Sequence, residues 1–318
     1  MTVTRVWKQR ALDFFVQAHQ RVFTRQQLAA LLASQSESFG TPPTLTLHRF
    51  INTLITSGQL REVRVTPALP ATPAQPPNEQ TAASENKDWA EGKDDRKGYR
   101  PFPRFVWGEA SPYEVALSLR PRSYLSHASA VFLHGLTRQI VRTVYANQEQ
   151  SPKPPPSGRL AQERIDYAFR APVRTSQYVF LYEGTRLMLL NGTNTGNLEV
   201  TEMAGPGDVV YSTTKLERTL IDITVRPTYA GGVFEVLEAF RGARERASVA
   251  TLLATLKRLD YVYPYQQALG FYMERAGYSG MALERIAASR TEFSFYLTHQ
   301  MSNPKFDARW RIYYPDGL

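Results

Sequence analysis

The first third of the chain carries apolar side chains in three helical patterns, followed by two strand-like segments. Helical spacing over residues 6–15, 25–32 and 44–57 predicts three short helices. Residues 60–65 alternate between apolar and polar side chains, and residues 104–107 supply a second strand for a hairpin. Three helices followed by a hairpin is the element order of a winged helix-turn-helix.

Local signals define the ends of the second and third helices. Thr24 and Gln27 form a Thr-x-x-Gln capping box, which starts a helix. Thr44 follows two prolines and starts the third helix, which ends near Gly58. The apolar stripe that we expect the third helix to bury consists of Leu47, Phe50, Ile51 and Leu54.

Two segments lack these patterns. Residues 66–100 are rich in proline and polar side chains and contain few large apolar groups, which predicts a disordered insertion in the wing. Residues 148–158 also hold several prolines and predict an exposed loop. We therefore divide the chain into a DNA-binding domain at 1–110 and a second domain at 111–318.

The second domain shows strand-like and helix-like segments in separate groups, which predicts an α+β fold. The expected strands are residues 165–170, 177–182, 186–190, 197–202, 209–211, 293–297 and 310–314. The expected helices are residues 214–224, 232–245, 248–259, 265–276 and 282–288. A Thr214-x-x-Glu217 capping box would begin the first of these helices.

Composition narrows the functional classes. The chain is 42% hydrophobic and has no run of about 18 apolar residues, so we expect no membrane span. Its N-terminus lacks the apolar stretch of a signal peptide. Without cysteine it can form no disulfide, thiolate metal site or cysteine nucleophile. These features favour a cytoplasmic protein.

The net charge of the chain is a mild indication of nucleic-acid binding. The chain has 38 basic and 29 acidic side chains, for a net charge of +9. Residues 1–65 hold eight basic and three acidic groups, so this fifth of the chain carries +5. Most of the basic residues are arginine, which binds phosphates and base edges with a planar fork of donors.

The third helix supplies the residue types that read DNA bases. In a winged helix this element enters the major groove, where arginine pairs with guanine and asparagine with adenine. The outward positions that we expect to contact bases are Thr46, His48, Arg49, Asn52 and Thr53. Helix N-termini would hold phosphates at Arg25, Gln26 and Thr44, and the wing would do so at Arg61 and Arg64.

No pattern in the sequence indicates catalysis, a cofactor or a metal. Phosphate-binding glycine loops and the nucleophile elbow are absent. His127 and His134 stand seven residues apart, too far to share an ion on one helix. Ser126 and His127 are adjacent and would occupy different helix faces, and Arg218 with Asp222 has the spacing of a surface ion pair. We therefore expect no enzyme.

Four segments of the second domain resemble the AbiEi family, the antitoxins of type IV toxin–antitoxin systems for abortive infection. They are SH-x-SA…HGLT at 126–137, S-x-x-ERTLID at 212–222, RP-x-YAGG at 226–232 and YPYQQA-x-GF at 263–271. Their order and spacing match the family over about residues 110–280. The segment 66–100 departs from the family pattern.

The resemblance implies two tasks. The N-terminal domain would bind inverted repeats of double-stranded DNA before its own operon and act as a transcriptional autorepressor. The second domain would oppose a nucleotidyltransferase-like toxin without forming a stable complex. Within the matching segments, the polar residues that could serve this second task are Lys215, Arg218, Asp222 and Arg226.

Two other functions remain open from the sequence. One is a nucleic-acid-processing enzyme with a basic C-terminal catalytic domain, whose metal ligands would have to come from Asp166, Glu183 and Glu199 on the strand-like segments. The other is a protein–protein adaptor whose winged helix has no DNA affinity.

Overall fold

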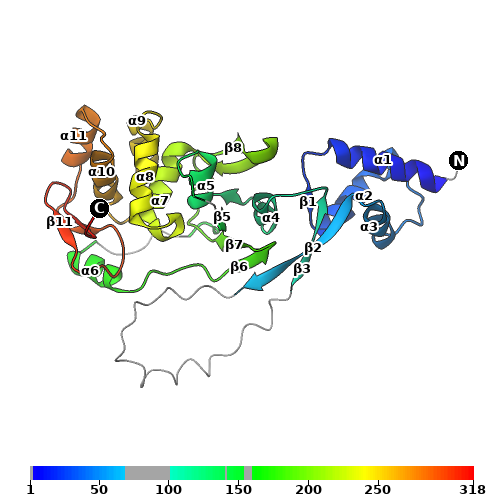
Figure 1. Cartoon of the computed structure of the whole chain (residues 1–318), viewed down its shortest axis with the longest axis horizontal. Coiled ribbons are helices and arrows are strands. Elements are labelled where there is room, and N and C mark those ends of the chain that lie inside the picture. The colour runs from blue at the N-terminus through cyan, green and yellow to red at the C-terminus, as the bar shows by residue number, and fades with distance from the viewer. Residues whose placement is uncertain (1–2, 69–100, 140–141, 154–159) are drawn as a thin grey trace, which may run out of the picture. The chain divides into compact units, whose positions relative to one another are not determined.

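The computed structural model describes residues 3–68, 101–139, 142–153 and 160–318. The chain divides into two compact units, which are described separately below (Figure 1). The first unit comprises Met1–Val115 and Ser176–Arg186, and the second comprises Ala116–Thr175 and Leu187–Leu318. Within the described ranges, no helix combines the length and the apolar character needed to cross a bilayer.

The first unit contains three helices and a small antiparallel sheet. Its helices are α1 (Val3–Gln17), α2 (Arg25–Phe39) and α3 (Leu47–Thr56), and α4 (Pro112–Ser118) begins in it. Its strands are β1 (Val22–Phe23), β2 (Leu60–Ala68), β3 (Phe102–Trp107) and β6 (Val179–Tyr182). They lie in the order β1-β3-β2-β6. The predicted hairpin is confirmed, because Leu60 pairs with Trp107 and Val65 with Phe102.

An aromatic core holds the three helices against the hairpin. Trp7, Phe15, Phe50 and Trp107 are buried together. The rings of Phe15 and Trp107 stack with centroids 4.9 Å apart, and the Trp7 and Phe50 centroids are 6.0 Å apart. Each such side chain buries a large apolar area, so a few of them stabilise a small unit.

Several local predictions for the first unit are confirmed and two are wrong. The Thr24 capping box is present, with the Thr24 side chain accepting from the Gln27 N–H. The N-cap of α3 is Thr46 rather than Thr44. Residues 66–68 were expected to be disordered but form the end of β2, where Thr66 pairs with Leu181 of β6. The rest of that predicted insertion, 69–100, lies outside the described residues.

The pairing of β2 with β6 also explains the unit boundary. The predicted division at residue 110 separates β2 from β6, whereas their backbone hydrogen bonds place the 176–186 segment in the first unit. The partner strand comes from more than a hundred residues further along the chain, and no local sequence pattern reports such a pairing.

The second unit combines two sheets with a helical layer. Its larger sheet has the order β7-β5-β4-β9-β8, and its smaller one the order β10-β12-β11. The strands are β4 (Tyr124–Leu125), β5 (Thr143–Asn147), β7 (Thr185–Leu190), β8 (Val200–Ala204), β9 (Val210–Thr214), β10 (Phe295–Tyr296), β11 (Lys305–Asp307) and β12 (Ile312–Tyr314). The helices are α5 (Ala128–Leu133), α6 (Gln162–Arg170), α7 (Leu216–Val225), α8 (Val233–Ala243), α9 (Val249–Leu259), α10 (Tyr265–Arg275) and α11 (Met281–Ala288). Two 3-10 helices are η2 (Pro206–Asp208) and η3 (Pro227–Ala230).

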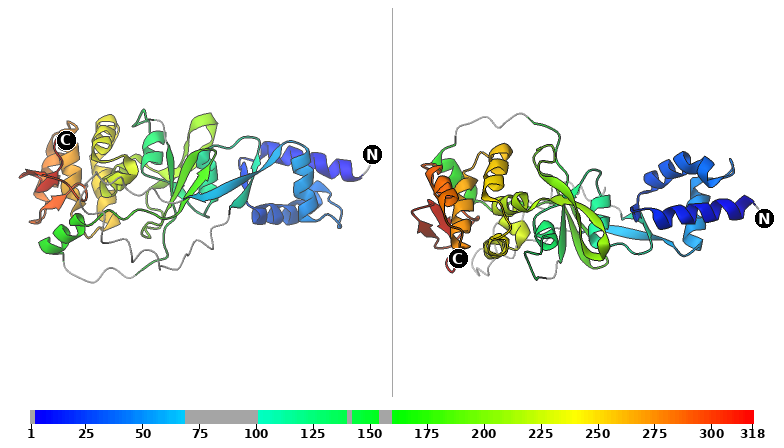
Figure 2. Two further views of the ribbon diagram at one scale, coloured as in Figure 1. Left: turned by 60° about the horizontal axis from the view of Figure 1, so that its bottom comes forward. Right: turned by 90° about the horizontal axis from the view of Figure 1, so that it is seen from above.

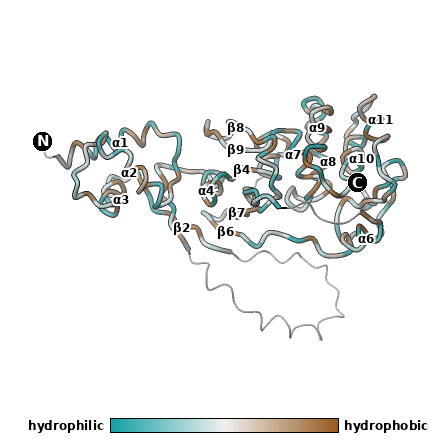
Figure 3. Tube along the Cα trace, turned by 180° about the vertical axis from the view of Figure 1, so that it is seen from behind, coloured by the Kyte–Doolittle hydropathy of each residue, from teal (hydrophilic) through white to brown (hydrophobic). Residues whose placement is uncertain are grey.

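Helices α7, α8 and α10 pack against one another and form the centre of this unit (Figure 2). Their buried side chains include Leu220, Phe240 and Phe271. Hydrophobic and hydrophilic residues are interspersed along them (Figure 3). Burial extends beyond one face on α7 and α10, where it covers the whole of Arg218–Thr224 and Gln267–Met273. The chain combines these helices with a sheet of parallel and antiparallel strand pairs, which confirms the α+β class.

Two element predictions for the second unit are wrong. Residues 165–170 were expected to be a strand but belong to α6, where Ile165 and Phe169 are buried one turn apart. The expected capping box at Thr214 is absent, since Lys215 is the N-cap of α7. Thr214 instead hydrogen-bonds Thr219 through its hydroxyl, and Glu217 accepts from the backbone of Ser248. In the predicted loop at 148–158, residues 148–153 have no regular structure and the others lie outside the described residues.

Gly270 on α10 is required by the packing of Trp310. A Cβ at position 270 would lie 2.0 Å from the fully buried Trp310 ring. We expect Gly270→Ala to lower the free energy of unfolding by about 2 kcal/mol, because the ring must move in a packed core. Urea unfolding of the full chain measures this change. Gly242→Ala on α8 is the matched control, since its Cβ would meet Leu136 at an ordinary 3.4 Å and should stabilise the helix. Equal stability of both variants would contradict the close packing of Trp310.

Candidate nucleic-acid interface

Helix α3 has one apolar face and one exposed polar face. Phe50, Ile51 and Leu54 are buried in the core of the first unit, and Leu47 packs against it. The 3.6-residue helical period then turns His48, Arg49 and Asn52 outward, where they are exposed. Thr53 is half-buried at the edge of this face.

The exposed face of α3 lines a shallow hollow together with one residue of α1. The lining residues are Lys8, Thr46, His48, Arg49, Asn52, Thr53 and Thr56. We refer to them as the α3 hollow. All five residues predicted to contact bases are among them. No acidic side chain belongs to this set, so the lining contributed by the described residues is cationic or neutral.

Hydrogen bonds within the α3 hollow divide its side chains into two groups. The hydroxyls of Thr53 and Thr56 donate to backbone carbonyls one turn earlier, and Thr46 accepts from the Arg49 N–H. The Asn52 Nδ2 lies 3.0 Å from the His48 Nε2. By contrast, the described residues offer no hydrogen-bond or ion-pair partner to the head groups of Arg49 and Lys8. These two cations are available to an anion.

Lys8 is the residue that the sequence analysis missed. It lies on α1, forty residues before α3, and comes next to it only because the two helices share the aromatic core. Lys8 is half-buried beside the buried Trp7, and no local sequence pattern reports its approach to α3.

The other predicted phosphate contacts lie outside the α3 hollow. Arg25 and Gln26 are exposed at the start of α2, and Thr44 is exposed before α3 without capping it. Arg61 donates to the Gly108 carbonyl at 3.3 Å, and Arg64 is exposed on β2.

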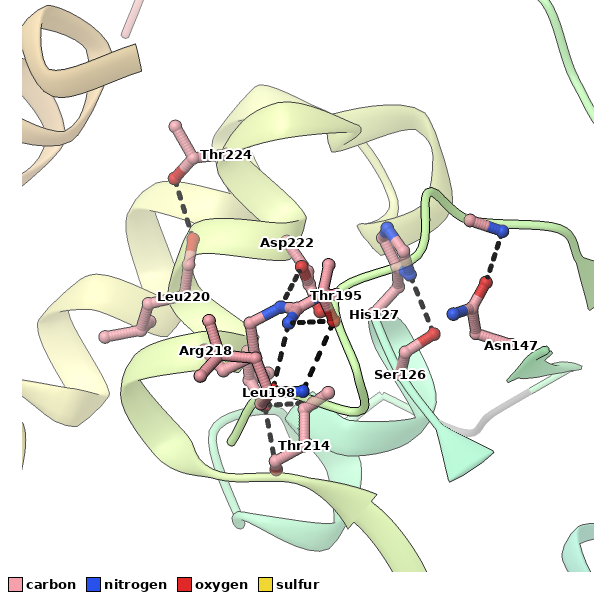
Figure 4. A network of polar contacts seen from close by, with 12 residues as sticks. Ser126, His127, Asn147, Thr195, Leu198, Thr214, Arg218, Leu220, Asp222 and Thr224 are labelled. Carbon is pink, nitrogen blue, oxygen red and sulfur yellow. Dashed lines mark hydrogen bonds and ion pairs between the residues drawn. The ribbon is translucent and has the colours of Figure 1, made fainter. Parts of the chain in front are cut away.

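In the second unit, Arg218 and Asp222 form a buried ion pair rather than the surface pair expected from their spacing. The Arg218 Nε lies 2.7 Å from the Asp222 Oδ1, and the two side chains are 6% and 7% exposed (Figure 4). Burial disfavours the charge of Arg218, but the adjacent Asp222 carboxylate outweighs this effect and raises the pKa of the guanidinium. The pair is buried because α7 packs on its neighbours along most of its circumference.

This ion pair also fixes the loop that precedes β8. Arg218 donates to the Leu198 carbonyl at 3.0 Å. The same loop is held from the other side by Glu149, which accepts from the backbone N–H groups of Thr195 and Asn197. These hydrogen bonds outweigh burial and lower the pKa of Glu149. Arg218 and Asp222 therefore fix the position of this loop and are not exposed to a partner.

Ser126 and His127 contact each other, contrary to the expectation from their adjacency. The Ser126 Oγ lies 2.9 Å from the His127 Nδ1 (Figure 4). The contact forms because His127 precedes α5 and adopts φ 51° and ψ −131°, so helical geometry does not separate the two side chains. The Tyr229 ring packs edge-on against the imidazole at a centroid distance of 5.4 Å. His134 ends α5 and donates from Nε2 to the Thr214 carbonyl at 2.8 Å, so both histidines have structural contacts.

Of the four polar residues in the AbiEi-like segments, two are accessible. Lys215 is 53% exposed and pairs with Glu199 at 2.9 Å. Arg226 is exposed directly after α7. These two are the ones that a partner of the second unit could contact.

The carboxylates considered for a metal-dependent nuclease do not form a site. Asp166 lies on helix α6, not on a strand, and accepts from Gln162 and Tyr296. Glu199 pairs with Lys215 and Arg258. Glu183 belongs to the first unit, whereas the other two belong to the second. Among the described residues, no group of three or more histidine, aspartate or glutamate side chains could hold a metal ion.

Comparison with protein-family models gives no match, and comparison with curated protein sequences gives none either. Among solved structures, the chain is similar to the Rv2827c protein from Mycobacterium tuberculosis. The two share 14% sequence identity with a TM-score of 0.50, and the match covers 96% of this chain and 90% of that chain. Identity this low shows the fold alone, so the likeness supports the α+β architecture over nearly the whole chain.

Buried His127 makes the stability of the chain depend on pH. Burial first, and then the charges of Arg218 and Arg226, lower the pKa of His127 to about 3. An unfolded histidine takes up its proton near pH 6.5, so the stabilisation is complete above that pH and is lost as the pH falls towards about 3. Between about pH 7 and pH 5 we expect this residue to remove about 2 kcal/mol from the free energy of unfolding.

Urea unfolding at both pH values tests this expectation against His127→Asn. Asparagine tolerates a positive φ and keeps a polar atom near Ser126, but it does not titrate. The variant should be less stable than the parent at about pH 7 and should lose less stability at about pH 5. The exposed His19→Asn serves as the matched control. An equal acid-dependent loss in His127→Asn would show that His127 is not the titrating group.

Proposed function

We propose that the chain is a sequence-specific DNA-binding protein whose first unit is a winged helix-turn-helix. In this proposal α3 is the recognition helix, and the β2–β3 hairpin is the wing. The observation that carries it is the α3 hollow, where Lys8, Arg49, His48 and Asn52 share one exposed face without an acidic neighbour among the described residues. A major groove accepts one helix, and its base edges bind these side-chain types.

The side chains of the α3 hollow suit different parts of DNA. Arg49, whose head group has no partner among the described residues, has a planar fork for the O6 and N7 acceptors of guanine, and Asn52 has an amide for adenine. Lys8 lies on a different helix, at the rim of the same face, and suits a phosphate. Arg64 on the hairpin and Arg25 and Gln26 at the start of α2 would add phosphate contacts.

We further propose that this DNA is the chain's own operator and that the second unit is the antitoxin of a type IV system. This part is supported by the resemblance of the four segments to the AbiEi family. Their apolar members lie in the core: Leu220 and Ile221 on α7 and Phe271 on α10 are fully buried. Lys215 and Arg226 remain as the surface residues through which the second unit would oppose a cytoplasmic nucleotidyltransferase-like toxin.

Substitutions in the α3 hollow should separate specific from non-specific DNA binding. Arg49→Ala and Asn52→Ala should each weaken discrimination between upstream DNA and a scrambled duplex by roughly 5- to 150-fold, because each removes a base contact. Lys8→Ala should weaken binding to both duplexes and reduce the salt dependence by about one phosphate contact. Fluorescence anisotropy of the full chain at two salt concentrations measures both effects. Arg285→Ala, an exposed arginine on α11, should bind as the parent does. Parental discrimination in both Arg49→Ala and Asn52→Ala would refute α3 as the recognition helix.

Point substitutions should also separate repression from toxin neutralisation. A truncation of residues 1–110 would leave β6 without β2, so it is unsuited to this purpose. We expect the double variant Arg49→Ala/Asn52→Ala to lose repression of an operon reporter and still to rescue growth of cells that co-express a nucleotidyltransferase-like toxin. Arg226→Ala should repress normally and rescue growth poorly, whereas Arg285→Ala should do both. Loss of rescue in the double variant would contradict a division of the tasks between the two units.

A further inference from the structure

One contact in the α3 hollow holds the side chain expected to read adenine. The Asn52 Nδ2 is 3.0 Å from the His48 Nε2, one helical turn away on the same face. An amide nitrogen can only donate, so the imidazole accepts at Nε2 and carries its own proton on Nδ1. The contact therefore requires a neutral His48.

This contact sets the orientation of the Asn52 amide. One of its two N–H groups is used by His48, which leaves the second N–H and the Oδ1 for a ligand. Adenine presents an acceptor at N7 and a donor at N6 in the major groove, and a bidentate amide matches both. The neutral His48 thus holds Asn52 in a form that can pair with adenine.

Protonation of His48 reverses the arrangement. Both ring nitrogens of an imidazolium donate, so the Nε2–H faces the Asn52 N–H group and repels it. The favourable alternative turns the amide so that Oδ1 accepts from His48. The amide then presents donors where adenine also has a donor, and the bidentate pair is lost.

The charges around His48 are all positive. The residues of α1 and α3 that line the hollow with it include Lys8 and Arg49 as the charged groups, and the described lining contains no carboxylate. Histidine as a residue type changes charge between about pH 5 and pH 8, and a protonated His48 would add a third cation to the hollow.

We propose that His48 is a positioning residue that controls base selection by Asn52, so that the protein prefers adenine at one operator position only while His48 is neutral. The inference rests on the proposed function, since it takes α3 to lie in the major groove. The proposal predicts two opposite effects of acidification. Overall DNA binding should become stronger because a cation is added, and selection of adenine should become weaker. A residue with a merely structural role would not move these two quantities in opposite directions.

Selection of the full chain on a randomised duplex library, at about pH 8 and about pH 5.5, tests the proposal. At the higher pH the parent should select adenine at a position whose preference disappears in Asn52→Ala. At the lower pH this preference should fall by roughly 5- to 150-fold while total binding rises.

Two substitutions at position 48 imitate the neutral and the protonated form of His48. In His48→Gln the side-chain oxygen can accept from Asn52 without titrating, so adenine selection should persist at both pH values. His48→Arg offers only donors and should select adenine weakly at both. His19→Gln, an exposed histidine outside the hollow, should behave as the parent does.

The outcomes distinguish this inference from the proposed function. Adenine selection by the parent that is unchanged at about pH 5.5, or an equal loss in His48→Gln, would overturn the role of His48 and leave the DNA-binding proposal intact. Selection with no position that depends on Asn52 would do the same. If the parent enriches no sequence at either pH, both proposals fail.

Discussion

The exposed face of α3 depends on the burial of its opposite face. A helix of ten residues is too short to be stable alone in water, so its conformation requires tertiary packing. Phe50 and Leu54, both fully buried, supply that packing by contacting the aromatic core of the first unit. Once they are buried, the helical period determines which side chains face solvent. The same core brings Lys8 of α1 to the hollow, so one set of apolar contacts determines the whole surface.

In the second unit the corresponding constraint is a buried ion pair. Two opposite charges, Arg218 and Asp222, are buried together on α7, and neither could remain charged in that environment without the other. Arg218 also donates a hydrogen bond to the Leu198 carbonyl, and this bond joins α7 to the loop before β8. A buried pair of this kind is weak support for stability as such, but it specifies which loop lies over which helix. Arg218 and Asp222 therefore have a structural role, whereas Lys215 and Arg226 remain exposed.

The sequence predicted elements whose signals are local. The Thr24 capping box and the stripe of α3 each depend on residues close in the chain, and the structure confirms them. The pairing of β2 with β3 is also confirmed, although Leu60 and Trp107 are far apart in the chain, because each strand has its own apolar pattern. Residues 165–170 were misread because a short apolar run fits both periods, although the spacing of Ile165 and Phe169 was that of a helix. The approach of Lys8 to α3 and the burial of Arg218 depend on tertiary packing, which no single-sequence pattern encodes. The His48–Asn52 contact could have been proposed from the i, i+4 spacing alone.

Strand β6 delays the completion of the first unit during synthesis of the chain. Its residues pair with Thr66–Ala68, so the sheet of the N-terminal unit is not complete until the chain has been extended to about residue 182. A ribosome adds about 5–20 residues each second, and the first three helices emerge several seconds before their last strand. The first unit thus receives its final strand only after part of the second unit has been made. A nascent chain that stalls before β6 carries α3 on an unfinished sheet, so the first unit can be completed only in a chain that also contains part of the second unit.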